Sequence, residues 1–166
     1  MREVSEARER RADRLKERIY LTFTALAVVL ALGGHTSATA EQALTTLAIT
    51  VAGTLLAVLV ADLVSHLVAH ERLPTLDELR HALASSVGTV GAVLLPFVFL
   101  GLATLGVWDT GRALRGSAVA LIVSLVAVGY AAVRRVRLPI WQRLVVLGAE
   151  AVLGLGVIGL ELLAHR

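Results

Sequence analysis

Long apolar runs, separated by short polar segments, make up most of the chain after residue 18. An α-helix needs about 20 apolar residues to cross a bilayer, whereas the elements of a soluble domain place apolar residues at periods of 3.6 or 2. The runs therefore predict an all-α polytopic membrane protein, a bundle of five transmembrane helices. The expected spans are about 19–34, 43–66, 82–106, 113–133 and 141–163. Too few residues remain for a separate soluble domain, so residues 19–166 are expected to form one membrane domain.

The amino-terminal segment, residues 1–18, differs from the rest because charged residues dominate it. Seven basic and five acidic residues lie within positions 1–20. Glu6 and Arg10 form an i,i+4 pair in the favourable order, with the acid first. The segment is predicted to be a cytoplasmic amphipathic helix that lies in or under the headgroups and runs into the first span. A solvated helical extension and a helix that binds a partner are the alternative interpretations.

Local signals mark several helix boundaries. Thr39 and Gln42 have the spacing of a capping box, which predicts that the second span begins directly after Thr39. Pro96 lies inside the third span, where a proline predicts a kink. The polar and glycine-containing stretch Trp108–Gly111 predicts a tight turn between the third and fourth spans.

Composition supports the membrane interpretation, and the charge distribution gives it an orientation. The chain is 57% hydrophobic and has no cysteine, which excludes disulfides, thiolate metal sites and thiol nucleophiles. Thirteen of the 16 basic residues lie in three segments, 1–20, 70–81 and 134–143. With five spans, these three segments all lie on the same side of the membrane. The positive-inside rule then puts the amino terminus in the cytoplasm and the carboxy terminus outside. Because this distribution accounts for the basic balance, no nucleic-acid partner is expected, and the richness in Arg, Ala, Leu and Val suggests a bacterial inner membrane.

Small and hydroxyl residues form stripes on three of the expected helices, where they would allow close packing and hydrogen bonding between neighbours. The positions are Thr50, Thr54, Ala57 and Ala61 in the second span, Ser85, Gly88 and Ala92 in the third, and Glu150 and Gly154 in the fifth. These three stripes are expected to face one another. The fourth span is then expected to be the most exposed to lipid.

Ionisable residues inside the apolar spans are the candidate functional groups, because their cost in lipid directs them toward protein or water. Asp62, His66 and His70 are spaced four apart and share one face of the second span. Asp62 lies about 9 Å, and Glu150 of the fifth span about 10 Å, from the inner ends of their helices. The residues expected near that level are Ser85, Ser86 and Thr89, with Glu161 as a secondary candidate nearer the outer surface. Together they predict a polar cavity in the inner half of the membrane.

Carboxylates and imidazoles relay protons or bind divalent metals within membranes. The favoured hypothesis is therefore a channel or transporter for protons or a divalent metal ion, with Asp62, His66 and His70 as metal ligands. The metal would be the substrate, and a pore formed by so small a chain predicts a homo-oligomer in the lipid bilayer. The alternative is a structural or accessory membrane subunit whose buried acids pair with arginines or hydroxyls. No motif of an intramembrane enzyme is present, so catalysis is not expected.

Overall fold

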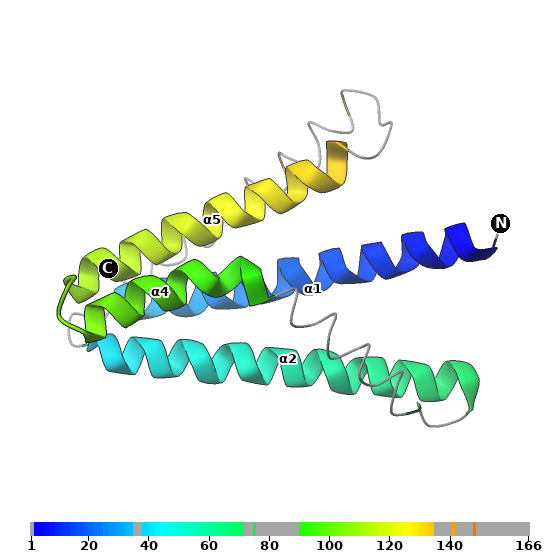
Figure 1. Cartoon of the computed structure of the whole chain (residues 1–166), viewed down its shortest axis with the longest axis horizontal. Coiled ribbons are helices and arrows are strands. Elements are labelled where there is room, and N and C mark those ends of the chain that lie inside the picture. The colour runs from blue at the N-terminus through cyan, green and yellow to red at the C-terminus, as the bar shows by residue number, and fades with distance from the viewer. Residues whose placement is uncertain are drawn as a thin grey trace.

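The described part of the chain is built from α-helices. The computed structural model describes residues 2–34, 38–71, 75, 90–134, 141 and 148, and it contains no strand in these segments. The helices are α1 (Arg2–Gly33), α2 (Ala40–His70), α4 (Leu94–Thr104) and α5 (Thr110–Arg134), with a short 3₁₀ helix, η1 (Gly91–Val93), before α4 (Figure 1). The all-α prediction is confirmed for these segments. The predicted fifth span, 141–163, lies almost entirely outside the described residues.

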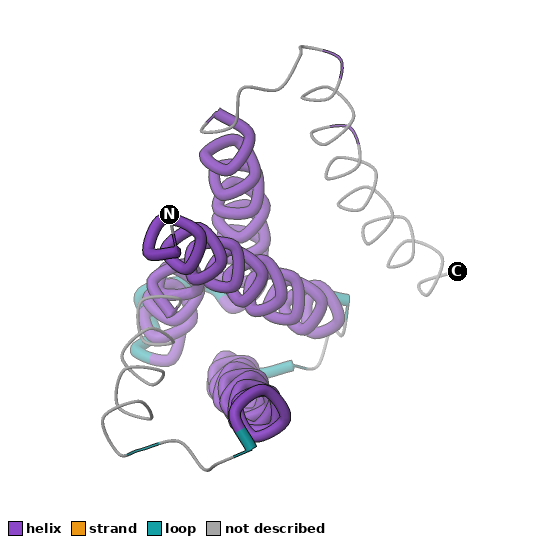
Figure 2. Tube along the Cα trace, turned by 90° about the vertical axis from the view of Figure 1, so that its right-hand side faces the viewer, coloured by secondary structure: helices purple, strands orange, loops and turns teal. Residues whose placement is uncertain are grey.

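The helices pack as a ring in which each of the four long elements contacts two others. α1 contacts α2 and α5, and α4 also contacts α2 and α5. η1 contacts α1, α4 and α5. Figure 2 looks along the bundle and shows the helices side by side. The end of α1, the start of α2 and the turn between α4 and α5 all lie at the same end, so α1 and α2 run antiparallel (Figure 1).

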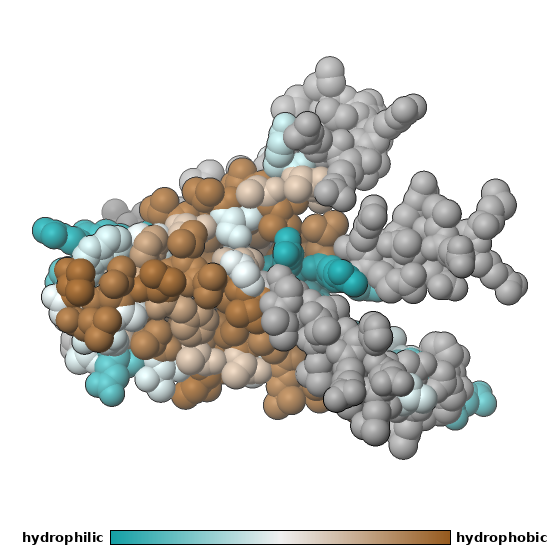
Figure 3. All heavy atoms as spheres, viewed as in Figure 1, coloured by the Kyte–Doolittle hydropathy of each residue, from teal (hydrophilic) through white to brown (hydrophobic). Residues whose placement is uncertain are grey.

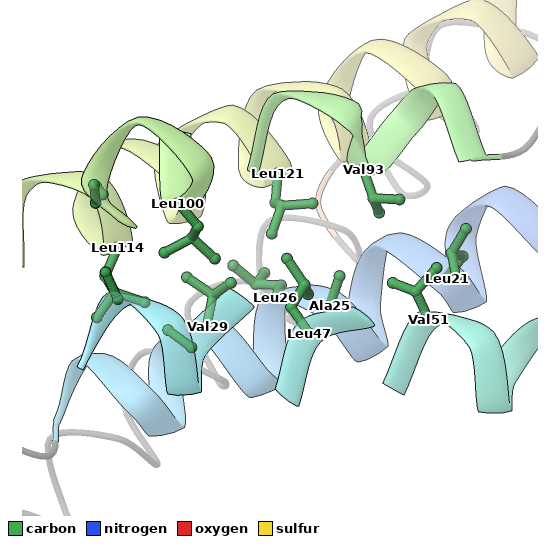
Figure 4. Close-up of a cluster of buried hydrophobic side chains, with 14 residues drawn as sticks. Leu21, Ala25, Leu26, Val29, Leu47, Val51, Val93, Leu100, Leu114 and Leu121 are labelled. Carbon is green, nitrogen blue, oxygen red and sulfur yellow. The ribbon is translucent and has the colours of Figure 1, made fainter. Parts of the chain in front are cut away.

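The core of the bundle is a single cluster of aliphatic side chains from all four helices. Leu26, Leu47, Leu100 and Leu121 are fully buried and represent α1, α2, α4 and α5 (Figure 4). Figure 4 places the side chains of Leu26 and Leu47 beside each other, which gives the register between α1 and α2. The predicted helix boundary at Thr39 is confirmed. Its hydroxyl accepts a hydrogen bond from Gln42 N at 3.2 Å, and its backbone N–H donates to Gln42 Oε1 at 3.1 Å.

Pro96 accounts for the interruption between η1 and α4. A proline has no N–H to donate to the carbonyl four residues earlier, and its ring crowds that carbonyl, which belongs here to Ala92. The chain adopts the tighter 3₁₀ form at Gly91–Val93, and regular α-helix begins at Leu94. The helix is therefore interrupted by a 3₁₀ segment about one turn before the proline, and a bend of the whole span stays a prediction.

The turn between α4 and α5 begins earlier than predicted. Leu105 through Asp109 connect the helices, Gly106 takes φ 73°, and Gly111 already belongs to the first turn of α5. The carboxylate of Asp109 caps α5, because its Oδ2 accepts a hydrogen bond from Arg112 N at 3.2 Å. A capping aspartate, rather than the glycine that follows, sets the start of this helix.

Within the described segments, two helices are long and apolar enough to cross a membrane, over Ala40–Val68 and Thr110–Ala132. α4 with η1 is a shorter apolar segment, Gly91–Thr104. α1 joins the charged amino-terminal segment to the predicted first span in one unbroken helix. Apolar side chains cover most of the coloured face in Figure 3.

One packing prediction is wrong, and another stays a prediction. Only 11% of the most apolar window of α2 is buried, against 33% for α5, so α2 rather than the fourth span is the most exposed. α5 is better covered because it packs more extensively on α1 and α4 than α2 does. In the predicted stripe of α2, Thr50 and Thr54 are half-buried, whereas Ala57 and Ala61 are exposed. The other two stripes lie outside the described residues except for Ala92.

Gly116 of α5 provides a test of this packing. A Cβ added at Gly116 would lie 3.4 Å from Phe99 Cδ2 and 3.9 Å from Trp108 Cζ3, whereas a Cβ on Gly53 of α2 would meet nothing within 4 Å. Gly116→Leu is therefore expected to lower the free energy of unfolding by about 1–3 kcal/mol through overpacking. Gly53→Leu, the matched control, should leave it nearly unchanged. Thermal unfolding in one detergent measures both, and equal losses would contradict the α4–α5 packing.

Candidate functional site

The candidate residues of α2 lie on a helix with two different faces. Large apolar side chains are exposed on the side opposite the core, namely Ile49, Leu56, Val60, Leu63, Val64 and Leu67. Asp62 is 15 residues after the buried Leu47, which places it about 60° from the inward direction, whereas Val60 lies about 220° from it. Asp62 and, one turn later, His66 therefore continue the inward edge of α2 while the outward face stays apolar.

The charged half of α1 lies opposite Asp62. Asp13 lies about 20 Å from Leu26 toward the amino terminus of α1, and Asp62 lies about 22 Å from Leu47 toward the carboxy terminus of α2. Because Leu26 and Leu47 are adjacent and the two helices are antiparallel, Asp13 and Asp62 lie at the same level of the bundle. Asp13 is close enough for its charge to act on the Asp62 carboxylate. Lys16 Nζ lies 3.2 Å from Asp13 Oδ1. This ion pair is largely exposed, and such pairs contribute little to stability.

The level shared with α1 bears on where Asp62 would lie in a membrane. α2 has 31 residues, or about 46 Å at 1.5 Å per residue, against about 30 Å for the hydrocarbon core. The neighbouring part of α1 carries the exposed side chains of Arg14, Lys16 and Arg18, which favour water or headgroups over lipid tails. α2 continues to His70, so Asp62 lies about 12 Å from the end of its helix rather than the roughly 9 Å estimated from the sequence, and its depth in a membrane stays a prediction.

His66 is partly buried, and its Nε2 atom is inaccessible to solvent. His70 is the last residue of α2, and its side chain lies outside the described part. Asp62 and His70 are eight residues apart, about 12 Å along the axis, which is too far for one ion with ligand distances of about 2.0–2.2 Å to bind all three predicted ligands at once. Among the described residues, no group of three or more His, Asp or Glu side chains is placed to hold a metal ion.

The remaining predicted site residues lie outside the described segments. These are Ser85, Ser86, Thr89, Glu150 and Glu161. The structure therefore brings together Asp62 and His66 and leaves the predicted match in depth between Asp62 and Glu150 as a prediction. It also adds Asp13, which sequence reasoning missed. Counting outward from the short connection between the first two helices would have found it, since Asp13 lies 20 residues before Gly33 and Asp62 lies 22 after Ala40.

Comparisons with protein-family models, with curated proteins and with solved structures found no match to this chain.

Proposed function

We propose that the chain is an integral membrane protein that moves a cation, either a proton or a divalent metal ion, with Asp62 at the cytoplasmic entrance of its route. The observation that carries the proposal is the division of α2 into an apolar outward face and an inward edge that bears Asp62 and His66 opposite the charged half of α1. The proposed route continues with the other predicted site residues, of which Glu150 is the most important.

The outward face of α2 supports the membrane placement. A core helix of a soluble protein is mostly buried, whereas the most apolar window of α2 is 11% buried. Soluble proteins rarely expose a continuous apolar surface of this length, because water disfavours it. Lipid is the environment that suits such a face along the whole of Ala40–Val68.

The inward edge supports the cation route. The charged side chains of α1 require hydration, so water is expected beside Asp62 even where the outward face of α2 meets lipid. Lys16 pairs with Asp13 at this level, so Asp62 is the carboxylate left to attract a cation along the inward edge. His66 and His70 would then lie on the cytoplasmic side of Asp62. The basic segments favour a cytoplasmic amino terminus and an outer carboxy terminus in a bacterial inner membrane, with more than one copy around a pore.

A labelling experiment tests the observation that carries the proposal. Single cysteines at Asp62 and at Val60 place a thiol on the inward edge or on the outward face at nearly the same depth. A membrane-impermeant maleimide applied from the cytoplasmic side is expected to label the cysteine at 62 several-fold faster than the one at 60. Equal labelling at both positions would remove the argument for a hydrated edge beside lipid.

An accessory subunit is the second candidate, and the exposure of Asp62 favours it. The Asp62 side chain is exposed rather than enclosed by the described helices, as expected if it served a contact with another subunit. Purified protein in proteoliposomes distinguishes the candidates. Flux under an imposed proton or metal gradient supports the cation route, whereas a protein that moves neither cation supports the accessory role.

A further inference from the structure

The turn between α4 and α5 is apolar and exposed, unlike most turns. Leu105 is 77% exposed, Val107 63% and Trp108 42%. Turns that face water favour Gly, Pro, Asn, Asp and Ser, which supply the required backbone conformations or local hydrogen bonds. Here Gly106 supplies the positive φ of the turn, and Asp109 supplies the local hydrogen bond. The three large apolar side chains contribute to neither.

The side chain of Trp108 is held in place beside the helices. Its ring lies with its centroid 5.2 Å from that of Phe99, at an interplanar angle of 32°. Gly116 leaves room for both rings, because a Cβ there would lie within 3.4 Å of Phe99 and 3.9 Å of Trp108. Phe99 is five residues before the end of α4, about 8 Å along the axis. The indole therefore extends back from the turn along the helix pair.

Two exposed arginines, Arg112 and Arg115, follow the turn in the first turns of α5. Nη2 of Arg115 lies 3.8 Å from the position that a Cβ on Gly111 would take. The guanidinium therefore reaches back toward the start of α5, as long basic side chains do when their stems lie in an apolar layer and their charges seek the surface. The Asp109 carboxylate accepts the cap hydrogen bond from Arg112 N, so the turn carries two guanidinium groups and one carboxylate.

We infer that this turn binds a glycerophospholipid of the outer leaflet. The guanidinium groups of Arg112 and Arg115 would bind the phosphate, for which their planar fork of donors is suited. The indole of Trp108 would lie at the level of the glycerol, where tryptophan is enriched in membrane proteins. The inference rests on the membrane placement and orientation in the proposed function and is independent of cation movement.

Tryptophan fluorescence tests the inference in the full chain. The chain has two tryptophans, so Trp141→Phe leaves Trp108 as the only emitter. In proteoliposomes, lipids brominated near the headgroup are expected to quench Trp108 more than lipids brominated near the chain end, and aqueous acrylamide should quench it less than free N-acetyltryptophanamide. Acrylamide quenching equal to that of the free compound, without quenching by lipid, would overturn the inference.

The arginines are tested by comparing brominated phosphatidylglycerol with brominated phosphatidylcholine as quenchers of Trp108. Phosphatidylglycerol carries a net negative charge and phosphatidylcholine carries none, although both contain a phosphate. The ratio of their quenching of Trp108 therefore reports the contribution of the guanidinium charges. The preference for phosphatidylglycerol is expected to fall about fivefold for each arginine removed in Arg112→Gln and Arg115→Gln. Arg112→Lys with Arg115→Lys keeps the charge and should retain part of the preference. An unchanged ratio in the double glutamine variant would overturn the assignment of the two guanidinium groups to an anionic headgroup, and flux measured on the same vesicles would separate this result from failure of the cation route.

Discussion

Asp62→Asn is expected to reduce cation flux through reconstituted protein by about tenfold or more. The amide has nearly the shape of the carboxylate and removes its negative charge at the proposed entrance. A unit charge about 4 Å from a cation contributes roughly 1 kcal/mol in water and about 4 kcal/mol at a protein surface. Since 1.4 kcal/mol corresponds to about a factor of ten, losing this charge should dominate the rate of entry. Flux in proteoliposomes under a fixed gradient measures the effect.

Asp109→Asn is the matched control for that variant. Asp109 lies in the turn at the opposite end of the bundle, and asparagine also caps helices well, so the fold should be retained. The same chemical change is expected to leave flux near the wild-type value. Full flux in Asp62→Asn, in protein shown to be folded, would remove Asp62 from the route. A loss of thermal stability without measurable flux in the wild type would favour the accessory role.

Leu47→Ala is expected to lower the free energy of unfolding by about 2–5 kcal/mol. Leu47 is fully buried in the cluster shared by the four helices, so truncation would leave a cavity where α2 meets α1. Membrane helices associate largely through such packing, because lipid is as apolar as the core. Steric trapping in bicelles can measure the change without removing the protein from a bilayer-like medium.

Leu56→Ala makes the same truncation on the opposite side of α2. Leu56 is 62% exposed, and its side chain is expected to contact lipid before and after the helices separate. Its loss should therefore change the free energy of unfolding by only a few tenths of a kcal/mol. Similar losses for the two variants would mean that the inward face of α2 is assigned wrongly.

The features that sequence reasoning predicted well depend on a few neighbouring residues. The capping box of Thr39 and Gln42 needs only the correct spacing, and the interruption before Pro96 follows from one missing N–H. The start of α5 was misplaced because both Asp109 and Gly111 are ordinary turn residues. Only the hydrogen bond to Arg112 N shows that Asp109 is the cap.

The features that it missed depend on how distant segments align. The apolar runs correctly located α2 but did not show which side faces the core, because Leu47 and Leu56 are equivalent in a run that is apolar on all sides. The alignment of Asp62 with Asp13 was missed for a similar reason. The level of Asp62 depends on its alignment with Asp13 across the bundle, and no count along a single helix contains that information.

The unbroken α1 also has a consequence for how the protein enters the membrane. Its apolar part, residues 19–34, is about 24 Å long, less than the hydrocarbon thickness of about 30 Å. α2 follows after a short connection and offers 29 apolar-rich residues, Ala40–Val68. The first segment to emerge therefore has a low affinity for lipid, and the segment that follows it directly has a high affinity. Under the proposed membrane placement, we expect such a pair to enter the bilayer as a helical hairpin, with the affinity of α2 for lipid carrying α1 into place and the charges of α1 holding its start on the side of synthesis.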